Sequence, residues 1–261
     1  MTDWYLGTMG FSFQDWAGSF YPSNLRPNKY LSFYSQFFNA VEIDTTFYGT
    51  PKKKTLNRWY DMTPKNFIFC LKLPRQITHE RKLVEAQSSL SEFLKNVSLL
   101  GEKLGVILVQ LPPEFSYEYF HVFSTFIKML PKNFRFAIEF RNQTWENPAT
   151  RNLFQEKHIC WASVDYTIMT KYILKTTDYL YIRWIGYHGQ FEKKDRIQKN
   201  TNRILEVWLE KIQENLNETK QIYGFFNNDF AGHSPASCNQ FKTLIGLPVK
   251  TPKIPRQTTL F

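Results

Sequence analysis

The sequence predicts a single-domain (β/α)8 TIM barrel that ends in an extended tail. Three observations lead to this prediction: eight short runs rich in aromatic and β-branched residues, amphipathic stretches between them, and a length of 261 residues. An open doubly wound sheet uses the same alternation, but the glycine-rich phosphate turn of a dinucleotide-binding sheet is absent. We therefore expect the barrel in residues 1–247 and the tail in residues 248–261.

Strands and helices are expected to alternate along most of the chain, with no helix predicted between the strands 159–165 and 179–185. The runs that predict strands are 4–7, 40–45, 67–73, 105–111, 135–140, 159–165, 179–185 and 221–227. Amphipathic spacing predicts helices at 29–38, 54–61, 87–102, 117–129, 149–157, 200–216 and 237–245. The last stretch holds three prolines and no helical periodicity, which predicts an extended chain.

The composition limits the classes of partner and compartment. A formal charge of +10 attracts polyanions over long range and favours nucleic acid or another phosphate-bearing partner, although a generic solubilising excess gives the same value. Three widely spaced cysteines without a CxxC pair suggest neither a disulfide framework nor a thiolate zinc site. Without a long apolar run or signal-peptide features at the start, we expect a cytoplasmic protein with no membrane partner.

Polar residues recur near the carboxyl ends of the expected strands. Successive side chains of a strand point to opposite faces, so that in one strand Phe136 and Ile138 oppose Glu139. We expect the polar side chains of seven strands to converge at the mouth of the barrel. They are Glu42, Lys72, Gln110, Glu139, Arg141, Asp165, Arg183 and Asn227 with Asp229.

Two interpretations of this cluster are open. Catalytic groups of barrel enzymes come from the carboxyl ends of the strands, because the loops there surround one hollow. Alternatively, the charges form a buried ion-pair network that only fills the mouth. Since apolar replacements of buried ion pairs are often no less stable, we favour a functional pocket.

Loop residues that follow the strands could complete the pocket. Trp16 lies in an aromatic loop, 11–22, and either stacks on bases or sugars or packs over the core. Arg75 and His79 follow the third strand, where His79 is a general acid or base or else a hydrogen-bonded structural residue. We expect Tyr48 and Trp145 to join Trp16 and Arg75 in binding substrate or nucleic acid.

No cofactor is required by the sequence. The five histidines show no HxH or HExxH spacing, but carboxylates of Glu42, Glu139, Asp165 and Asp229 could hold a divalent metal such as Mg²⁺ through water. Neither a GxSxG elbow nor a GxxxxGK[ST] loop is present. Glu139 and Asp165 are a conceivable carboxylate pair for glycoside chemistry if their separation suits it.

The chain resembles the YecE-like family, known as domain of unknown function 72. The matching stretches are 7–12, 15–16, 20–22, 41–43, 46–48, 77–79, 110–113, 137–141, 181–183 and 226–229, with Phe69, Lys72, Trp145 and Asp165. The resemblance implies a TIM barrel distantly similar to xylose-isomerase and endonuclease-IV-like barrels, and no established activity. The recurring residues of the family fall on Glu42, Lys72, His79, Glu139, Arg141, Asp165, Arg183 and Asn227.

One departure from the family pattern concerns the seventh strand. Many members carry His-Gly after the strand-seven arginine, whereas this chain has Ile185-Gly186, with His188 two residues later. A mechanism that requires the family histidine is therefore in doubt here.

The last residues resemble the Gln-x-x-Leu-Phe peptide by which bacterial replication and repair proteins dock on the DNA sliding clamp. Leu260 and Phe261 would fill an apolar pocket of the clamp, and Gln257 would fix the register by hydrogen bonding. The alternative is that both apolar residues cap the bottom of this barrel.

The leading hypothesis is an enzyme of nucleic-acid metabolism, recruited by a sliding clamp and acting on a phosphate or a base. A hydrolase of phosphodiester or glycosidic bonds would fit. Arg141, Arg183 and Lys72 would stabilise anionic oxygen, while Glu42, Glu139, Asp165 or His79 would act as general acid or base or carry a metal. The alternatives are a non-catalytic adaptor for nucleic acid or the clamp, and an enzyme of sugars or sugar phosphates.

Overall fold

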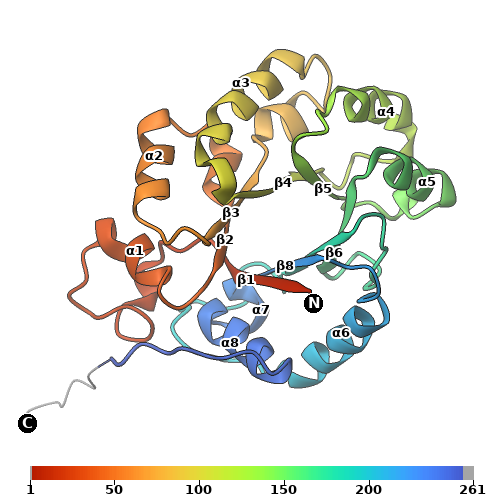
Figure 1. Cartoon of the computed structure of the whole chain (residues 1–261). Coiled ribbons are helices and arrows are strands. Elements are labelled where there is room, and N and C mark those ends of the chain that lie inside the picture. Colours follow the sequence, from red (N-terminus) through yellow and green to blue (C-terminus); the bar gives the residue numbers. More distant parts are fainter. Residues whose placement is uncertain (1, 255–261) are drawn as a thin grey trace, which may run out of the picture.

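The computed structural model describes residues 2–254 and has the expected closed barrel of eight parallel strands (Figure 1). Each strand pairs with its two neighbours, and the first strand closes the ring by pairing along six residues with the last. The strands are β1 Asp3–Met9, β2 Ala40–Ile43, β3 Ile68–Lys72, β4 Leu104–Gln110, β5 Arg135–Glu139, β6 Cys160–Asp165, β7 Tyr179–Trp184 and β8 Gln221–Phe226. The predicted fold class is confirmed.

The helices form an outer ring around the strands (Figure 1). They are α1 Tyr30–Tyr34, α2 Lys53–Asp61, α3 Gln87–Val97, α4 Phe120–Met129, α5 Pro148–Lys157, α6 Asn202–Glu214, α7 Asn228–Ala231 and α8 Ser234–Leu244. The third predicted helix, 87–102, ends early because Gly101 adopts φ 51°, and the chain forms a 3-10 segment, Ser98–Lys103, instead. The short helix α7 was not predicted from the sequence.

The side chains that point into the barrel fill its interior because large residues on some strands pack beside small residues on others. Tyr179, Tyr181 and Tyr223, from β7 and β8, are buried in the interior. The adjoining strands β5 and β6 contribute the small side chains of Ala137 and Cys160. Gly105 leaves room as well, because a Cβ atom there would lie 2.5 Å from Ile68 Cγ2. The lower barrel is therefore a packed core, and only the strand ends can form a site.

The opposite face of each strand packs against the helix ring. Phe136, Ile138 and Phe140 of the β5 segment lie in this outer core, as the alternation predicts. The two faces together fix which residues point toward the barrel axis at the carboxyl ends of the strands.

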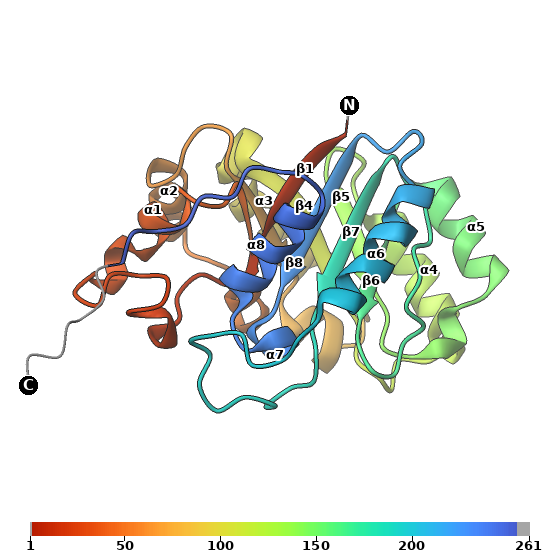
Figure 2. The ribbon, with the colours of Figure 1, turned by 90° about the horizontal axis from the view of Figure 1, so that it is seen from below.

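The two ends of the barrel differ. In Figure 2 the N-terminus and the tail lie near one end, and the long connection between β7 and α6 lies at the other, where the strands end. Residues 248–254 contain no helix or strand and run past α1, away from the barrel. Gln257, Leu260 and Phe261 lie outside the described residues. None of the described helices is long and apolar enough to cross a membrane.

Candidate functional site at the barrel mouth

Arg183, at the end of β7, is the centre of a buried ion-pair network. Its Nε and Nη2 atoms donate to both carboxylate oxygens of Glu42 on β2 at 2.7–3.1 Å, and Nη1 donates to Glu139 Oε2 on β5 at 2.5 Å. Tyr181, two residues earlier on the same face, donates to Glu42 Oε2 at 2.6 Å. Both carboxylates are 0% exposed. These groups form the floor of the barrel mouth.

The two floor carboxylates have different proton affinities. Burial, assisted by the nearby Asp44 carboxylate, outweighs Arg183 and raises the pKa of Glu42 to about 7. Burial also disfavours the charge on Glu139, but Arg141 and Arg183 outweigh it and lower the pKa of Glu139 to about 2. Glu139 is therefore the fixed negative charge of the floor, and Glu42 is the carboxyl that can take up a proton near neutral pH.

Lys72 stands above this floor at the end of β3 without an ion-pair partner. Its side chain is half-buried, and Nζ lies 4.0 Å from the centroid of the Phe47 ring. No carboxylate of the described residues lies within 4.0 Å of Nζ. Burial, followed by the positive charge of Arg183, lowers the pKa of Lys72.

His79 lies beside Lys72. Its ring packs edge-on against the same Phe47 ring, with 4.8 Å between the centroids. Nδ1 makes a 2.8 Å hydrogen bond with Thr78 Oγ1, and Nε2 lies 3.4 Å from the amide nitrogen of Gln110. Burial, then the charge of Lys72, lowers the pKa of His79 to about 4, so the imidazole is neutral at physiological pH.

Arg141 supplies the second outward cation of the mouth. Its Nε donates to Glu139 Oε1, and its guanidinium lies 4.0 Å from the centroid of the Tyr166 ring. The side chain is 12% exposed, and its terminal nitrogens make no hydrogen bond to any residue in 2–254. Arg141 is thus held on two sides while its Nη atoms stay available to a ligand.

Asn227 and Asp229 follow β8 and mainly organise the chain around the mouth. The side-chain oxygen of Asn227 caps α7 by accepting from Asp229 N at 2.9 Å. Asp229 is buried, and its oxygens lie 3.2 Å from His188 Nδ1 and 3.2 Å from Lys194 Nζ. This carboxylate therefore anchors the connection between β7 and α6 rather than facing the floor.

The expectation that Asp165 joins the mouth was wrong. Asp165 shares the face of Trp161, which packs in the outer core, so its side chain points toward the helix ring. There it accepts from Trp208 Nε1 of α6 at 2.7 Å and pairs with Lys171 Nζ at 2.9 Å. A carboxylate pair with Glu139 for glycoside chemistry is thereby also ruled out.

Two tryptophans that were expected to bind ligand are core residues instead. Trp16 is 0% exposed and donates from Nε1 to Asn228 Oδ1 at 3.1 Å. Trp145 is also 0% exposed, donates to the Phe115 carbonyl at 2.7 Å and stacks on Phe140 with 4.6 Å between centroids. Each indole is satisfied within the fold, so neither offers a face to a base or sugar.

Tyr48 and Arg75 do lie at the surface after β2 and β3. Tyr48 is 78% exposed at the end of the short helix Asp44–Tyr48. Arg75 has a half-exposed side chain and pairs with Glu80 at 3.0 Å. A ligand contact at the rim stays a prediction for both residues, and Arg75 already has an acidic partner in Glu80.

The four carboxylates proposed for a metal do not meet. Glu42 and Glu139 direct their oxygens to arginine, and Asp165 and Asp229 point to other partners. Among residues 2–254, no group of three or more His, Cys, Asp or Glu side chains is arranged to hold a metal ion. The donor set at the mouth suits an anion better than a cation.

Sequence reasoning missed three residues that shape the mouth. Tyr181 has the same alternation as Arg183, so strand parity could have identified it. Phe47 and Tyr166 lie outside the strands, and no signal in the sequence places their rings against Lys72 and Arg141.

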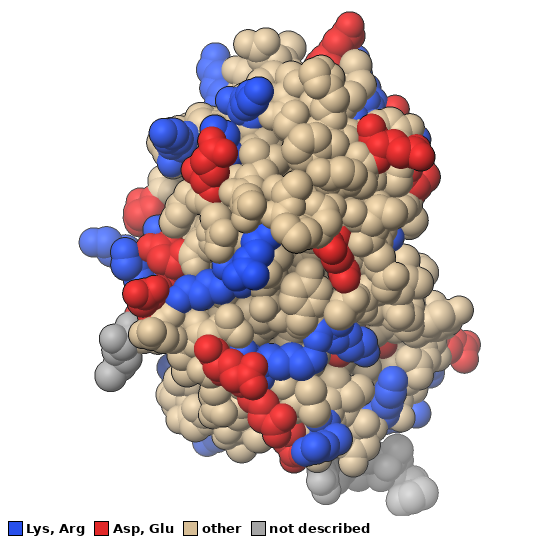
Figure 3. Space-filling model, turned by 90° about the vertical axis from the view of Figure 1, so that its right-hand side faces the viewer, with Lys and Arg blue, Asp and Glu red and all other residues tan. Residues whose placement is uncertain are grey.

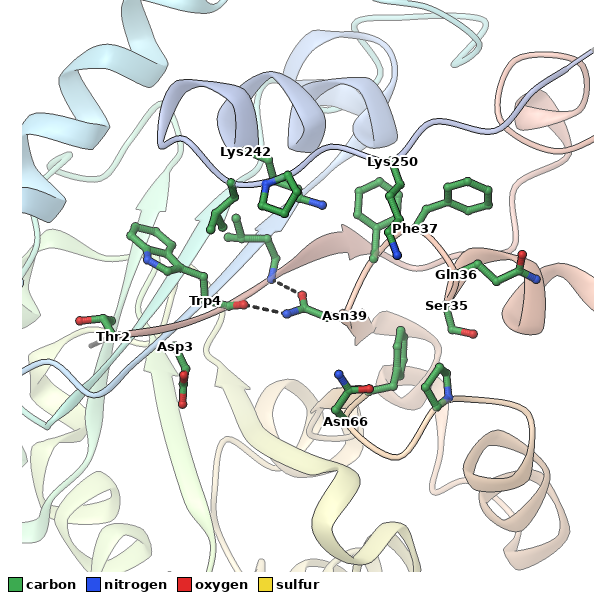
Figure 4. A pocket seen from close by; sticks show the side chains of 16 residues that line it. Thr2, Asp3, Trp4, Ser35, Gln36, Phe37, Asn39, Asn66, Lys242 and Lys250 are labelled. Atoms are coloured by element: carbon green, nitrogen blue, oxygen red, sulfur yellow. Dashed lines mark hydrogen bonds between the residues drawn. The ribbon is translucent and has the colours of Figure 1, made fainter.

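A separate hollow of about 650 Å³ lies at the opposite end of the barrel (Figure 4). Trp4, Phe37, Asn39, Lys242 and Lys250 line part of it, and Asn39 bridges β1 by hydrogen bonds to Leu6 N and Trp4 O at 3.0 and 2.7 Å. None of the predicted site residues lines it. Residues at this end of a barrel usually contribute to stability rather than to chemistry.

Comparison with known proteins finds relatives over nearly the whole chain. The chain is 26% identical to the UPF0759 protein YecE of Escherichia coli K12, covering 88% of this chain and 92% of the relative. It is also 26% identical to the UPF0759 protein YunF of Bacillus subtilis, covering 98% and 99%.

Solved structures agree with the fold. A DUF72 family protein from Thermotoga maritima superposes with a TM-score of 0.77 at 27% identity, covering 94% of this chain and 99% of the other. Another from Enterococcus faecalis gives 0.76 at 22% identity, covering 95% and 99%, which supports the fold alone. The family described as "Protein of unknown function DUF72" matches residues 5–259, and the chain therefore belongs to this family.

Proposed function

We propose that the protein is an enzyme that binds a phosphate-bearing substrate at the barrel mouth, and that nucleic acid is the source of this phosphate. One observation carries the proposal. Arg183 directs its guanidinium to two buried carboxylates, whereas the terminal nitrogens of Arg141 and the ammonium of Lys72 have no acidic partner among the described residues. A phosphate would supply the missing acceptors.

The floor fixes the position of the anion-binding group. Glu139 accepts from Arg183 and Arg141 with different oxygens, so a single buried carboxylate holds the two arginines in one arrangement. The Tyr166 ring supports the guanidinium of Arg141 from another side. Such preorganised cations stabilise negative charge better than mobile ones, because they need not reorient when the ligand binds.

The choice of nucleic acid rests on the overall charge and on the connection between β7 and α6. The chain carries a formal charge of +10, and this connection exposes Lys193 and Lys199, which have no ion-pair partner among the described residues, at the end of the barrel where the mouth lies. The face over α4, α5 and α6 carries both signs of charge (Figure 3). A polyanion is therefore expected to approach along the strand ends rather than across that face.

The proposal is tested by measuring the affinity of the purified chain for a labelled single-stranded oligonucleotide by fluorescence anisotropy. A charged hydrogen bond contributes about 1.5–3 kcal/mol, so Arg141→Gln should weaken binding by about tenfold or more. Lys95→Gln, on the exposed side of α3, removes the same charge elsewhere and serves as the matched control. A smaller, salt-dependent loss is expected from the control.

Equal affinities of Arg141→Gln and Lys95→Gln would refute the assignment of the mouth as the phosphate site. If each variant weakens oligonucleotide binding only by the effect of one lost charge, and no oligonucleotide is turned over, the result would instead support a non-catalytic adaptor. If the protein binds phosphorylated sugars through Arg141 and does not bind oligonucleotides, the phosphate comes from a small metabolite.

Recruitment by a sliding clamp is a separate part of the proposal, because it involves Gln257, Leu260 and Phe261 rather than the mouth. The support is the similarity of the last five residues to a clamp-binding peptide. The described tail before them, 248–254, is partly exposed and carries Lys250 and Lys253.

A further inference from the structure

We propose that Lys72 forms a covalent imine with an aldehyde or ketone group of the phosphate-bearing substrate, while Arg141 holds the phosphate. The inference rests on the proposed function, which it deepens by naming the reactive group of the substrate. The inference starts from Lys72, whose ammonium group pairs with neither of the two floor carboxylates.

Burial and the nearby charge of Arg183 lower the pKa of Lys72, so its ammonium group loses a proton more readily than that of an exposed lysine. Arg183 takes Glu42 and Glu139 as partners, and Glu139 also takes Arg141, so the buried acids are already committed. Lys72 Nζ lies instead over the Phe47 ring at 4.0 Å, with its stem in the barrel wall. A lysine that is partly buried, placed near another cation and unpaired is the type that proteins use as an amine nucleophile.

The position of Lys72 suits a reaction with a bound molecule. Lys72 is the last residue of β3, and Thr46 Oγ1 donates to its backbone carbonyl at 2.7 Å, which fixes the strand end. Residues at the carboxyl ends of barrel strands face the hollow formed by the loops. The next two inward positions around the ring belong to Gln110 of β4 and Glu139 of β5, which pair in register. Arg141 follows Glu139 by two residues, so the amine and the free guanidinium border the same opening.

His79 can move the protons that this reaction requires. Its neutral imidazole contacts the same Phe47 ring as Lys72, and Gln110 and Thr78 orient its two nitrogens. A neutral imidazole accepts a proton at one nitrogen and, once protonated, donates it to a leaving oxygen. No other proton carrier is needed.

The proposed step balances without a further reactant. The ammonium group of Lys72 gives a proton to His79, and the resulting amine attacks the carbonyl carbon, so that a C–N bond forms and the carbonyl π pair moves to the oxygen. His79 gives that proton to the oxygen, which yields the carbinolamine. His79 then takes one proton from the nitrogen and gives it to the hydroxyl, and the C–O bond breaks to release water. The product is a protonated imine, which withdraws electrons from the adjacent carbon and so prepares a neighbouring bond for cleavage.

The test is reductive trapping of the full-length chain with sodium cyanoborohydride. Two probes distinguish the sources of the carbonyl: dihydroxyacetone phosphate, a small ketone, and a short single-stranded oligonucleotide with an abasic site, which carries an aldehyde between phosphates. Peptide mass spectrometry should locate one dominant adduct on Lys72. Lys72→Arg should lose that adduct, and Lys95→Arg should keep it.

The outcomes separate this inference from the proposed function. Phosphate binding is measured separately, by comparing the parent chain with Arg141→Gln on an unmodified oligonucleotide, which has no carbonyl group that could form an imine. If oligonucleotide binding depends on Arg141 but neither probe gives an adduct, the imine proposal is overturned and the proposal of a phosphate site is kept. Adducts spread evenly over surface lysines in the parent and in Lys72→Arg would overturn it as well.

Discussion

Replacing Arg183 with Met should destabilise the protein severely, because it leaves two carboxylates buried without their main partner. Arg183 is 3% exposed and provides four donor contacts of 2.5–3.1 Å to Glu42 and Glu139. Removing one member of a buried ion pair typically costs about 3–5 kcal/mol, since the remaining charge stays desolvated. Tyr181 still donates to Glu42, and Arg141 still donates to Glu139, so we expect a loss of about 4 kcal/mol rather than twice that.

The assay is urea denaturation followed by circular dichroism, at about pH 7 and about pH 5. In Arg183→Met the folded-state pKa of Glu42, which is already raised, should rise further, and that of Glu139 should rise above its unfolded value, because the main opposing charge is gone. A group with a raised folded pKa stabilises the protein fully below its unfolded pKa and loses this contribution as pH rises through the folded pKa. The difference between variant and parent should therefore shrink at the lower pH.

Two results would refute this reasoning. A loss of less than about 1 kcal/mol at neutral pH would mean that the carboxylates are not dependent on Arg183. A large loss that is the same at both pH values would point to lost packing rather than to uncompensated charge. Arg203→Met is the matched control, because Arg203 lies on the exposed side of α6 and pairs only with Glu206 at 3.3 Å.

Three further predictions concern other parts of the chain. Burial lowers the pKa of His233 to about 4, and burial together with the charge of Lys72 lowers the pKa of His79 to about 4. Both neutral imidazoles should therefore contribute stability above pH 6.5, the unfolded pKa, and this contribution is lost as the pH falls through about 4. In acid titrations between those two pH values, His233→Gln should lose less stability than the parent chain. Trp16→Phe should lower the free energy of unfolding by about 1–2 kcal/mol through the lost hydrogen bond to Asn228, yet leave oligonucleotide affinity unchanged, and a weaker affinity would restore a binding role for this loop. Deletion of Leu260 and Phe261 should abolish binding to a bacterial sliding clamp in surface plasmon resonance, and equal binding by the truncated chain would end the docking proposal.

Strand alternation predicted most of the mouth because the parallel barrel imposes it on every strand. Glu42, Lys72, Glu139 and Arg183 each stand on the face opposite large apolar neighbours, and each points inward. Closure of the ring then brings residues together that are far apart in the chain, such as Glu42 and Arg183, which are separated by 141 positions. The period of two along a strand was sufficient for this part of the prediction.

The wrong predictions concern side chains whose hydrogen-bond partners lie in other elements of the fold. Asp165 has the same alternation as Trp161, and its hydrogen bond to Trp208 depends on the packing of α6, which strand parity does not describe. Trp16 is equally instructive. An aromatic loop after a strand can face a ligand or fold onto the core, and Asn228, more than two hundred positions away, determines which happens here.

The floor of the mouth is difficult to explain by stability alone. Apolar residues of similar volume in place of Arg183, Glu42 and Glu139 would often give a protein of equal or greater stability, because the desolvation penalty of the charges would disappear. Such a replacement would remove the geometry above the floor, since Glu139 directs Arg141, and it would remove the Arg183 charge that, after burial, lowers the pKa of Lys72. The buried network therefore has its clearest purpose as the support of two outward groups, one guanidinium positioned for an anion and one amine kept reactive. We expect a variant with apolar residues at all three positions to fold stably. In that variant, adding Arg141→Gln should no longer change the affinity for an oligonucleotide.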